Sequence, residues 1–208
     1  MIQDIDCVIL TGGKSSRMKA DIGIDKAHLD FWGEPLYFRQ FKKLSALFEN
    51  TYISAKTFDN YPKLSTLDII KDLGNVEGIN TNLLYAPALG MLSAFETLQS
   101  KKIFFIGVDT PFVSEDSIKA LIAISQSSDK NAVVASAGDK IHPTCGVYSK
   151  NVTDELKRMI VEDKHKLTLF LEKVGTIFVE TGDASELANL NRYEDYEKAI
   201  RDGVNPFR

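Results

Sequence analysis

The sequence predicts an α/β fold of three layers, in which a mainly parallel sheet is covered by helices on both faces. Short apolar runs rich in β-branched and aromatic residues alternate along the chain with stretches of helical periodicity. Strands that alternate with helices form parallel βαβ units, whose helices cover the sheet. The 208 residues suit a single domain over residues 1–208, because no repeat, low-complexity tract or Pro/Gly-rich linker divides them.

Strands and helices are expected in a regular order. Strands are expected over residues 7–10, 51–55, 67–70, 102–108, 131–136, 143–149 and 176–180. Helices are expected over residues 36–48, 87–98, 114–124, 151–161 and 166–172, with a closing helix from about Tyr193. Ser114 is a suitable N-cap for the third helix, and Glu115 and Asp116 suit its positive end.

Two of these helices have apolar residues at the spacing of one buried face. In the first helix these residues are Leu36, Phe38, Phe41, Leu44, Leu47 and Phe48. In the second they are Leu89, Leu92, Phe95 and Leu98. Each helix should therefore pack one face on the sheet.

Composition and charge exclude several classes of protein. The formal net charge of −4 argues against nucleic-acid binding, which needs a basic surface. No apolar stretch approaches the roughly 20 residues that span a bilayer, and the N-terminus lacks the basic start of a secretory signal. We therefore expect a cytoplasmic protein without a membrane partner. Cys7 and Cys145 fall in expected strands and lack metal-site spacing, so two buried thiols are expected.

The first expected strand ends in a polar loop with two adjacent glycines, Gly12 and Gly13. Because these residues lack Cβ atoms, a phosphate could approach the main-chain donors. Arg17 could bind phosphate with its planar fork and Lys26 could add a point charge, which suits a nucleoside triphosphate. The P-loop pattern fails at Val8, and the adjacent glycines do not fit the dinucleotide pattern. An ordinary strand-to-helix turn with solvated lysines is the alternative.

Two further strands are each followed by an acidic residue. Asp109 follows the strand over 102–108, at the edge of the sheet where a carboxylate could hold Mg²⁺ against phosphate oxygens. The alternative is that Asp109 only makes an Asx-turn before Pro111. Asp72 follows the strand over 67–70 and could accept hydrogen bonds from a base or ribose.

These motifs, together with others in the same order over nearly the whole chain, resemble those of the molybdenum cofactor guanylyltransferases. These are the MobA-type enzymes of the nucleotidyltransferase superfamily. Their loop motif is L-A-G-G-x-x-x-R-M-G followed closely by D-K, and this chain has LTGGKSSRM and then DKAHL. Further matches are GEPL at 33–36, KD ending at Asp72, PALGMLSA at 87–94, VDTPFV around Asp109, HPT at 142–144 and NLN at 189–191.

The resemblance implies a Rossmann-like nucleotidyltransferase fold and assigns roles to individual residues. It implies a GTP site made by Leu10, Thr11, Gly12, Gly13, Lys26, Ser54, Asp72 and Asp109. It places the pterin-side substrate, with less specific motifs, at His142, Thr144, Asn189 and Asn191. Because His142 precedes Pro143, we expect it to be extended in a loop, either touching the substrate or simply at the surface.

The implied reaction is the transfer of GMP from GTP to the terminal phosphate of molybdopterin, with release of pyrophosphate and formation of the guanine dinucleotide cofactor. Asp109 would hold Mg²⁺, and Arg17 and Lys26 would stabilise the departing pyrophosphate. The implied partners are GTP, molybdopterin or the molybdenum cofactor, and the proteins that deliver the cofactor or accept it as molybdoenzymes.

Four departures from the family pattern leave alternatives open. Thr11 replaces the usual alanine, and the loop between Met18 and Asp25 is longer and lacks its glycine. Ala86 replaces a glycine, and NRYEDY replaces the usual N-T-P-x-D/E-L ending. The alternatives are a related enzyme that uses CTP or a sugar-phosphate acceptor, and a non-catalytic nucleotide-binding module.

Overall fold

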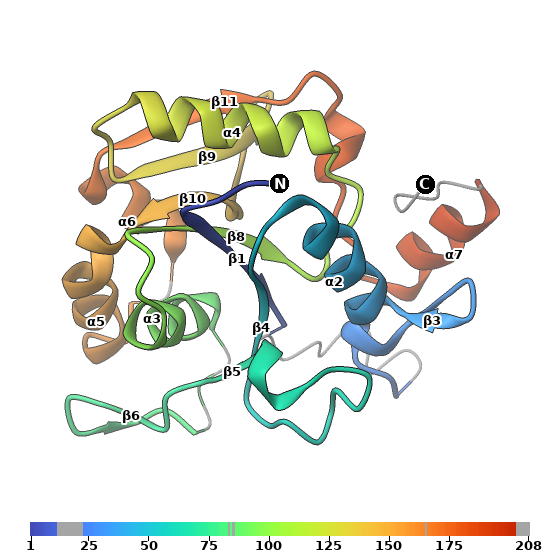
Figure 1. The fold of residues 1–208 in the computed structure, drawn as a ribbon, viewed down its shortest axis with the longest axis horizontal. Helices are drawn as coiled ribbons and strands as arrows, with labels where there is room; N and C mark the ends of the chain where they lie inside the picture. The colour runs from blue at the N-terminus through green and yellow to red at the C-terminus, as the bar shows by residue number, and fades with distance from the viewer. Residues whose placement is uncertain (12–22, 83, 85, 165, 203–208) are drawn as a thin grey trace.

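A seven-stranded sheet with the strand order β11-β9-β10-β8-β1-β4-β5 runs through the centre of the protein in a computed structural model (Figure 1). The structure describes residues 1–11, 23–82, 84, 86–164 and 166–202. The strands of this sheet are β1 (Ile5–Leu10), β4 (Thr51–Ala55), β5 (Ile69–Lys71), β8 (Lys102–Gly107), β9 (Ala132–Ala137), β10 (Lys140–Ser149) and β11 (Thr176–Glu180).

The sheet is mainly parallel, as the sequence predicts. β1 pairs in parallel with β4 and β8, β4 with β5, and β11 with β9. β10 is antiparallel to both of its neighbours, β8 and β9. The carboxyl ends of β1, β4, β5 and β8 therefore meet at one edge of the sheet.

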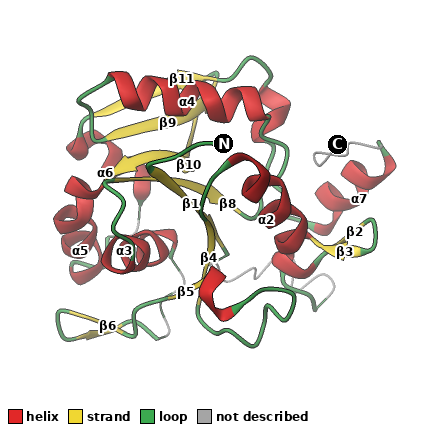
Figure 2. Ribbon diagram, viewed as in Figure 1, coloured by secondary structure: helices red, strands yellow, loops and turns green. Residues whose placement is uncertain are grey.

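Helices cover both faces (Figure 2). The two layers contain α2 (Leu36–Leu47), α3 (Pro87–Thr97), α4 (Glu115–Ser127), α5 (Thr153–Val161) and α6 (Leu167–Val174). The last helix, α7 (Tyr193–Arg201), lies to the side of the sheet (Figure 2), where Tyr196 contacts Asp30 and Phe31. The 3-10 helices are η1 (Lys26–His28), η2 (Thr66–Asp68), η3 (Lys150–Val152) and η4 (Ala184–Leu187). None of the helices in the described ranges is both long and apolar enough to cross a membrane.

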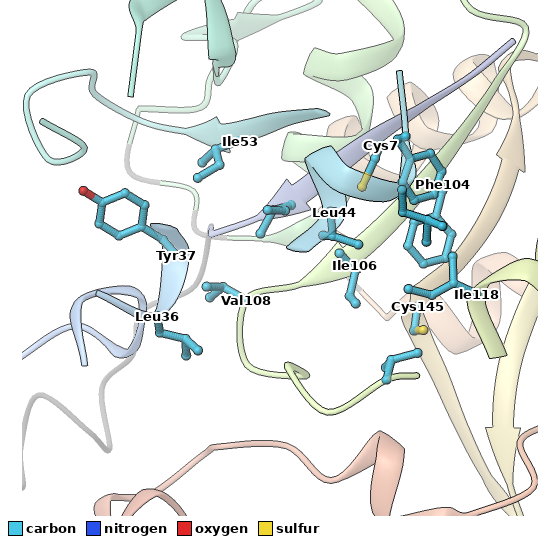
Figure 3. Close-up of a cluster of buried hydrophobic side chains, with 14 of the residues drawn as sticks. Cys7, Leu36, Tyr37, Leu44, Ile53, Phe104, Ile106, Val108, Ile118 and Cys145 are labelled. Carbon is cyan, nitrogen blue, oxygen red and sulfur yellow. The ribbon is translucent and has the colours of Figure 1, made fainter. Parts of the chain in front are cut away.

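Alternate residues of the strands face the two helical layers. Cys7 of β1 lies in the core that α2 and α4 cover (Figure 3), and Ile9 belongs to the same core. Val8 and Leu10 lie in the core that α3, α5 and α6 cover. Burying one large apolar side chain contributes about 1.5–3 kcal/mol, so both layers stabilise the sheet strongly. Both thiols are buried, as expected, and burial raises the pKa of Cys145 to about 12.

The helices that the sequence predicts all form, with small differences. α3 buries Leu89, Leu92 and Phe95 as expected, and Ser114 caps α4 by accepting a hydrogen bond from the Ser117 N–H. The predicted buried face of α2 is correct but incomplete, since Phe38 and Phe41 pack against the core as expected. The structure buries Tyr37 and Gln40 there, while Phe38 and Phe41 are half-buried.

One further prediction needs correction, and two elements were not predicted. His142 does not lie in a loop at the surface, because β10 begins at Lys140 and His142 is only 5% exposed. Two short hairpins also escape the sequence analysis, β2–β3 (Asp30–Phe31 and Glu34–Pro35) and β6–β7 (Asn75–Val76 and Ile79–Asn80). Strands of two residues are too short to show an alternating pattern.

Candidate nucleotide site

Three strand ends lie side by side at the carboxyl edge of the sheet. Leu10 of β1 pairs with Ser54 of β4 on one side and with Gly107 of β8 on the other. The backbone N–H of Val108 donates to the Leu10 carbonyl at 3.0 Å, so the chain leaves β8 directly beside the end of β1. In open α/β sheets this edge is where ligands bind.

Lys26 and Asp109 form the charged centre of this edge. The Lys26 ammonium lies 2.7 Å from Oδ2 of Asp109 and donates to Oδ1 of Asn191 at 3.1 Å. Asp25 caps η1 by accepting a hydrogen bond from the Ala27 N–H, which fixes the start of the turn that carries Lys26. The Lys26 and Asp109 side chains are 15% and 24% exposed. The pair is thus sheltered but open to a ligand.

The segment over 189–191 is anchored to the turn after β8. The Leu190 N–H donates to the Asp109 carbonyl at 2.8 Å, and the Thr110 hydroxyl donates to Oδ1 of Asn189 at 2.9 Å. Asn191 adds a third connection, because its Oδ1 accepts a hydrogen bond from Lys26. Lys26 and Asp109, which the resemblance assigns to the nucleotide, therefore lie next to Asn189 and Asn191, which it assigns to the second substrate.

Thr144 and His142 approach the same corner from β10. A Cβ built on Gly107 would lie 2.6 Å from Oδ1 of Asp109 and 3.3 Å from the Thr144 hydroxyl, so both side chains crowd the end of β8. Burial lowers the pKa of His142, Lys140 lowers it further, and Asp109 opposes the change. The imidazole is therefore neutral at pH 7, with one donor and one acceptor nitrogen.

A second group of polar side chains lies at the ends of β1, β4 and β5. The Ser54 hydroxyl donates to Oδ1 of Asp72 at 2.6 Å. The Thr11 hydroxyl donates to the Ser54 carbonyl and accepts from the Tyr61 hydroxyl, both at 2.7 Å. Burial raises the pKa of Asp72, although the Ser54 hydrogen bond and the nearby Lys56 oppose this. Asp72 thus offers a desolvated carboxylate at the sheet edge.

Gly90 of α3 leaves the space that Ser54 occupies. A Cβ at this position would lie 2.6 Å from the Ser54 hydroxyl and 3.0 Å from Cδ2 of Leu10. The first distance is shorter than real Cβ contacts and the second is tighter than most of them, so a larger residue would displace the serine. A glycine in the middle of a helix costs about 1 kcal/mol relative to alanine, and close packing against β1 and β4 accounts for it here.

The donor set at Asp109 fits a magnesium ion that is held mainly by a substrate. Among the described residues no group of three His, Cys, Asp or Glu side chains could enclose a metal. Mg²⁺, however, commonly uses one or two carboxylates and takes its other ligands from phosphates and water. The single, partly exposed carboxylate of Asp109 satisfies that requirement.

The structure brings together most of the residues that the sequence singled out. Leu10, Thr11, Ser54 and Asp72 form one group, and Lys26, Asp109, His142, Thr144, Asn189 and Asn191 form the other. Gly12, Gly13 and Arg17 lie outside the described residues. The sequence analysis missed Tyr61, which lies in an aperiodic segment and gave no signal. It also assigned no role to Gly90, although a glycine inside a helical pattern often marks close packing.

The strand order, with β10 antiparallel in a mainly parallel sheet, and the acidic residues beyond β5 and β8 define an α/β protein of the nucleotidyltransferase type. The sequence model described as "MobA-like NTP transferase domain" matches residues 7–177. The chain belongs to this family of MobA-like NTP transferases.

Proteins of similar sequence align with almost the whole of this chain. A protein named molybdenum cofactor guanylyltransferase from Campylobacter jejuni is 32% identical over 199 residues, which cover 95% of this chain and 96% of that protein. The protein of the same name from Helicobacter pylori is 32% identical over 203 residues, which cover 97% and 94%.

Solved structures share the fold at lower identity. The crystal structure of molybdopterin-guanine dinucleotide biosynthesis protein A from Archaeoglobus fulgidus superposes with a TM-score of 0.78 at 20% identity, covering 96% of this chain and 100% of that one. The 4-diphosphocytidyl-2C-methyl-D-erythritol synthase from Anaerococcus prevotii reaches 0.69 at 14% identity, covering 97% and 96%.

Proposed function

We propose that this protein transfers GMP from GTP to the terminal phosphate of molybdopterin, releasing pyrophosphate and forming the guanine dinucleotide cofactor. The observation that carries the proposal is the meeting of Lys26, Asp109 and Asn191 at the carboxyl edge of a nucleotidyltransferase sheet. The full-length similarity to proteins named molybdenum cofactor guanylyltransferase supports GTP and the pterin cofactor as the two substrates.

The two polar groups suit the two ends of a nucleotide. The desolvated carboxylate of Asp72 can accept hydrogen bonds from the N–H groups of a guanine base, and Ser54 holds one of its oxygens in place. The ammonium of Lys26 suits the triphosphate, where its charge can stabilise the departing pyrophosphate. Gly12, Gly13 and Arg17 would contribute main-chain donors and a second cation.

Asp109 would hold Mg²⁺ with the phosphates of GTP. When bound, the ion neutralises part of the negative charge of the triphosphate. Lys26, which is held by Asn191, would then orient Asp109, and the limited exposure of this ion pair restricts the access of water.

The reaction needs no general base on the protein. The second pKa of a phosphate monoester is about 6, so the attacking phosphate is already ionised at pH 7. The protein is left to position the two substrates and to stabilise negative charge, which is the usual division of work in phosphoryl transfer. Neutral His142, together with Thr144, Asn189 and Asn191, would orient the pterin-side substrate beside Asp109.

Thermal denaturation with GTP, CTP or ATP, each with and without Mg²⁺, tests the nucleotide. A ligand that binds the native state raises the midpoint of unfolding, by an amount that grows with its affinity. We expect the largest increase with GTP and Mg²⁺ together. A larger increase with CTP would contradict the assignment to guanine and favour a cytidylyltransferase.

Several further expectations stay predictions. These are the cytoplasmic location, the lack of a nucleic-acid partner, and the proteins that deliver the cofactor or accept it as molybdoenzymes.

A further inference from the structure

Tyr61 makes a directed hydrogen bond into the candidate nucleotide site. Its hydroxyl lies 2.7 Å from the Thr11 hydroxyl, which in turn lies 2.7 Å from the Ser54 carbonyl. The carbonyl can only accept, so the Thr11 proton goes to Ser54 and Tyr61 must donate to Thr11. Both of these hydroxyls are therefore fixed in direction.

This hydrogen bond joins a segment outside the sheet to three strand ends. The Ser54 carbonyl accepts hydrogen bonds from both the N–H and the hydroxyl of Thr11. The Ser54 hydroxyl donates to Asp72. The ends of β1, β4 and β5 are thus connected through Thr11 and Ser54, and Tyr61 is the outermost member of the chain. The loop motif of the family usually has alanine at the position of Thr11. The hydrogen bonds from Tyr61 and to Ser54 therefore depend on a threonine that departs from this motif.

The ring of Tyr61 also contacts the element that carries Lys26. Its centroid lies 5.5 Å from that of His28, which ends η1, and 4.9 Å from that of Tyr37 in α2. His28 is held in turn by a 2.6 Å contact between Nε2 and the Asn60 carbonyl. Tyr61 therefore contacts Thr11, in the group proposed to bind the base, and His28, in the turn that carries Lys26.

We propose that Tyr61 is a positioning residue of the nucleotide site, which acts through Thr11 on the ends of β1 and β4 and through His28 on η1. The inference rests on the proposed function, because it assumes that a nucleotide binds at this edge. Burial raises the pKa of Tyr61 to about 12, so the hydroxyl keeps the proton that it donates throughout the neutral range.

A set of variants separates this role from simple loss of stability. In Thr11→Ala the Tyr61 hydroxyl stays buried without its acceptor, whereas in Tyr61→Phe the Thr11 hydroxyl keeps its bond to Ser54. The double variant removes both groups, and replacing both partners costs less than orphaning one. Thr11→Ser retains the hydroxyl. Tyr37→Phe is the matched control, since Tyr37 is buried in the same aromatic group and its oxygen bonds the Lys63 backbone.

The experiment is calorimetric titration of each variant with Mg²⁺ and GTP, beside the midpoint of thermal unfolding without nucleotide. We expect the Kd for GTP to rise about tenfold in Thr11→Ala and about threefold in Tyr61→Phe. The double variant should bind no more weakly than Thr11→Ala, and Thr11→Ser should restore most of the affinity that Thr11→Ala loses. Tyr37→Phe should bind like the wild type.

The opposite results overturn the proposal. A Thr11→Ala protein that unfolds at lower temperature yet binds GTP as tightly as the wild type would show a structural role alone. Losses that simply add in the double variant would show that the two residues act separately. A wild-type protein that binds no GTP would overturn the proposed function, and the positioning role with it, whereas unchanged variants of a GTP-binding wild type would overturn the positioning role alone.

Discussion

The ammonium of Lys26 lies 2.7 Å from a carboxylate oxygen of Asp109, although 83 residues separate the two in the chain. The ion pair joins the turn η1 to the end of β8. The segment that precedes α7 contacts both residues, because Asn191 accepts a hydrogen bond from Lys26 and the Leu190 N–H donates to the Asp109 carbonyl. Each of these groups is therefore positioned by the others. Substitutions at Asp109 and Lys26 test this arrangement, and substitutions at Asp72 and Gly90 test the neighbouring group around Ser54.

Asp109→Asn keeps the size of the side chain but removes its charge. If the carboxylate holds magnesium and positions Lys26, turnover should fall by about a hundredfold or more. The unfolding midpoint should change little, because a partly exposed ion pair contributes only about 0–1 kcal/mol. Release of pyrophosphate from GTP and molybdopterin gives the rate. Glu115→Gln, which breaks an exposed ion pair with Lys119, is the control. Turnover near that of the wild type in Asp109→Asn would refute the metal assignment.

Lys26→Met removes the cation and retains most of the apolar stem. The KM for GTP should rise about tenfold or more and kcat should fall, because a hydrogen bond to a charged group is worth about 1.5–3 kcal/mol. Steady-state kinetics over a range of GTP concentrations separates the two effects. Lys119→Met removes an exposed lysine of α4 and serves as the control. Unchanged kinetics in Lys26→Met would mean that the lengthened loop directs this lysine away from the phosphates.

Asp72→Asn should stabilise the free protein while weakening its binding of GTP. Burial raises the pKa of Asp72 above its ordinary value of 3.8, so folding favours the protonated carboxyl. Its contribution to stability is present below pH 3.8 and is lost as the pH rises through the raised pKa, so the carboxylate costs stability at pH 7. We expect the asparagine variant to unfold about 2 °C higher at pH 7.

The difference between Asp72→Asn and the wild type should shrink as the pH falls through the raised pKa. Thermal unfolding over a series of pH values and titration with GTP measure the two effects. A lower midpoint together with unchanged GTP affinity would contradict both the burial argument and the role in the base site.

Gly90→Ala tests the close packing of α3 on β1 and β4. Alanine normally stabilises a helix by about 1 kcal/mol relative to glycine. Here the new Cβ would lie 2.6 Å from the Ser54 hydroxyl, so the serine must turn away from Asp72. We expect weaker GTP binding, measured by calorimetric titration, without the gain in stability. A more stable protein with full affinity would show that Ser54 does not need this space.

The main features of the fold could be predicted because they depend on local patterns. Alternating apolar runs and helical periodicity indicate the sheet and its covering helices, and parallel strands bring their carboxyl ends to one edge. Asp72 and Asp109 could be placed at that edge for this reason alone. The prediction places His142 in a loop because a proline, here Pro143, is unusual inside a strand. The structure accommodates Pro143 in β10 where the pairing with β9 is irregular, between Ile141 and Gly146.

The rest of the site depends on contacts between segments that are distant in sequence. Asn191 approaches Lys26 across 165 residues, and no pattern around either residue indicates this contact. The resemblance to a family, rather than periodicity or spacing, singled out Asn189 and Asn191. Tyr61 lies in an irregular segment, so its hydrogen bond to Thr11 could be found only in three dimensions.

The most direct test of the account is the release of pyrophosphate from GTP by the purified protein, with and without molybdopterin, in the presence of Mg²⁺. We expect release that requires molybdopterin and yields the guanine dinucleotide in equal amount. Binding of GTP without any release of pyrophosphate when molybdopterin is present would contradict the transferase assignment and identify a nucleotide-binding module.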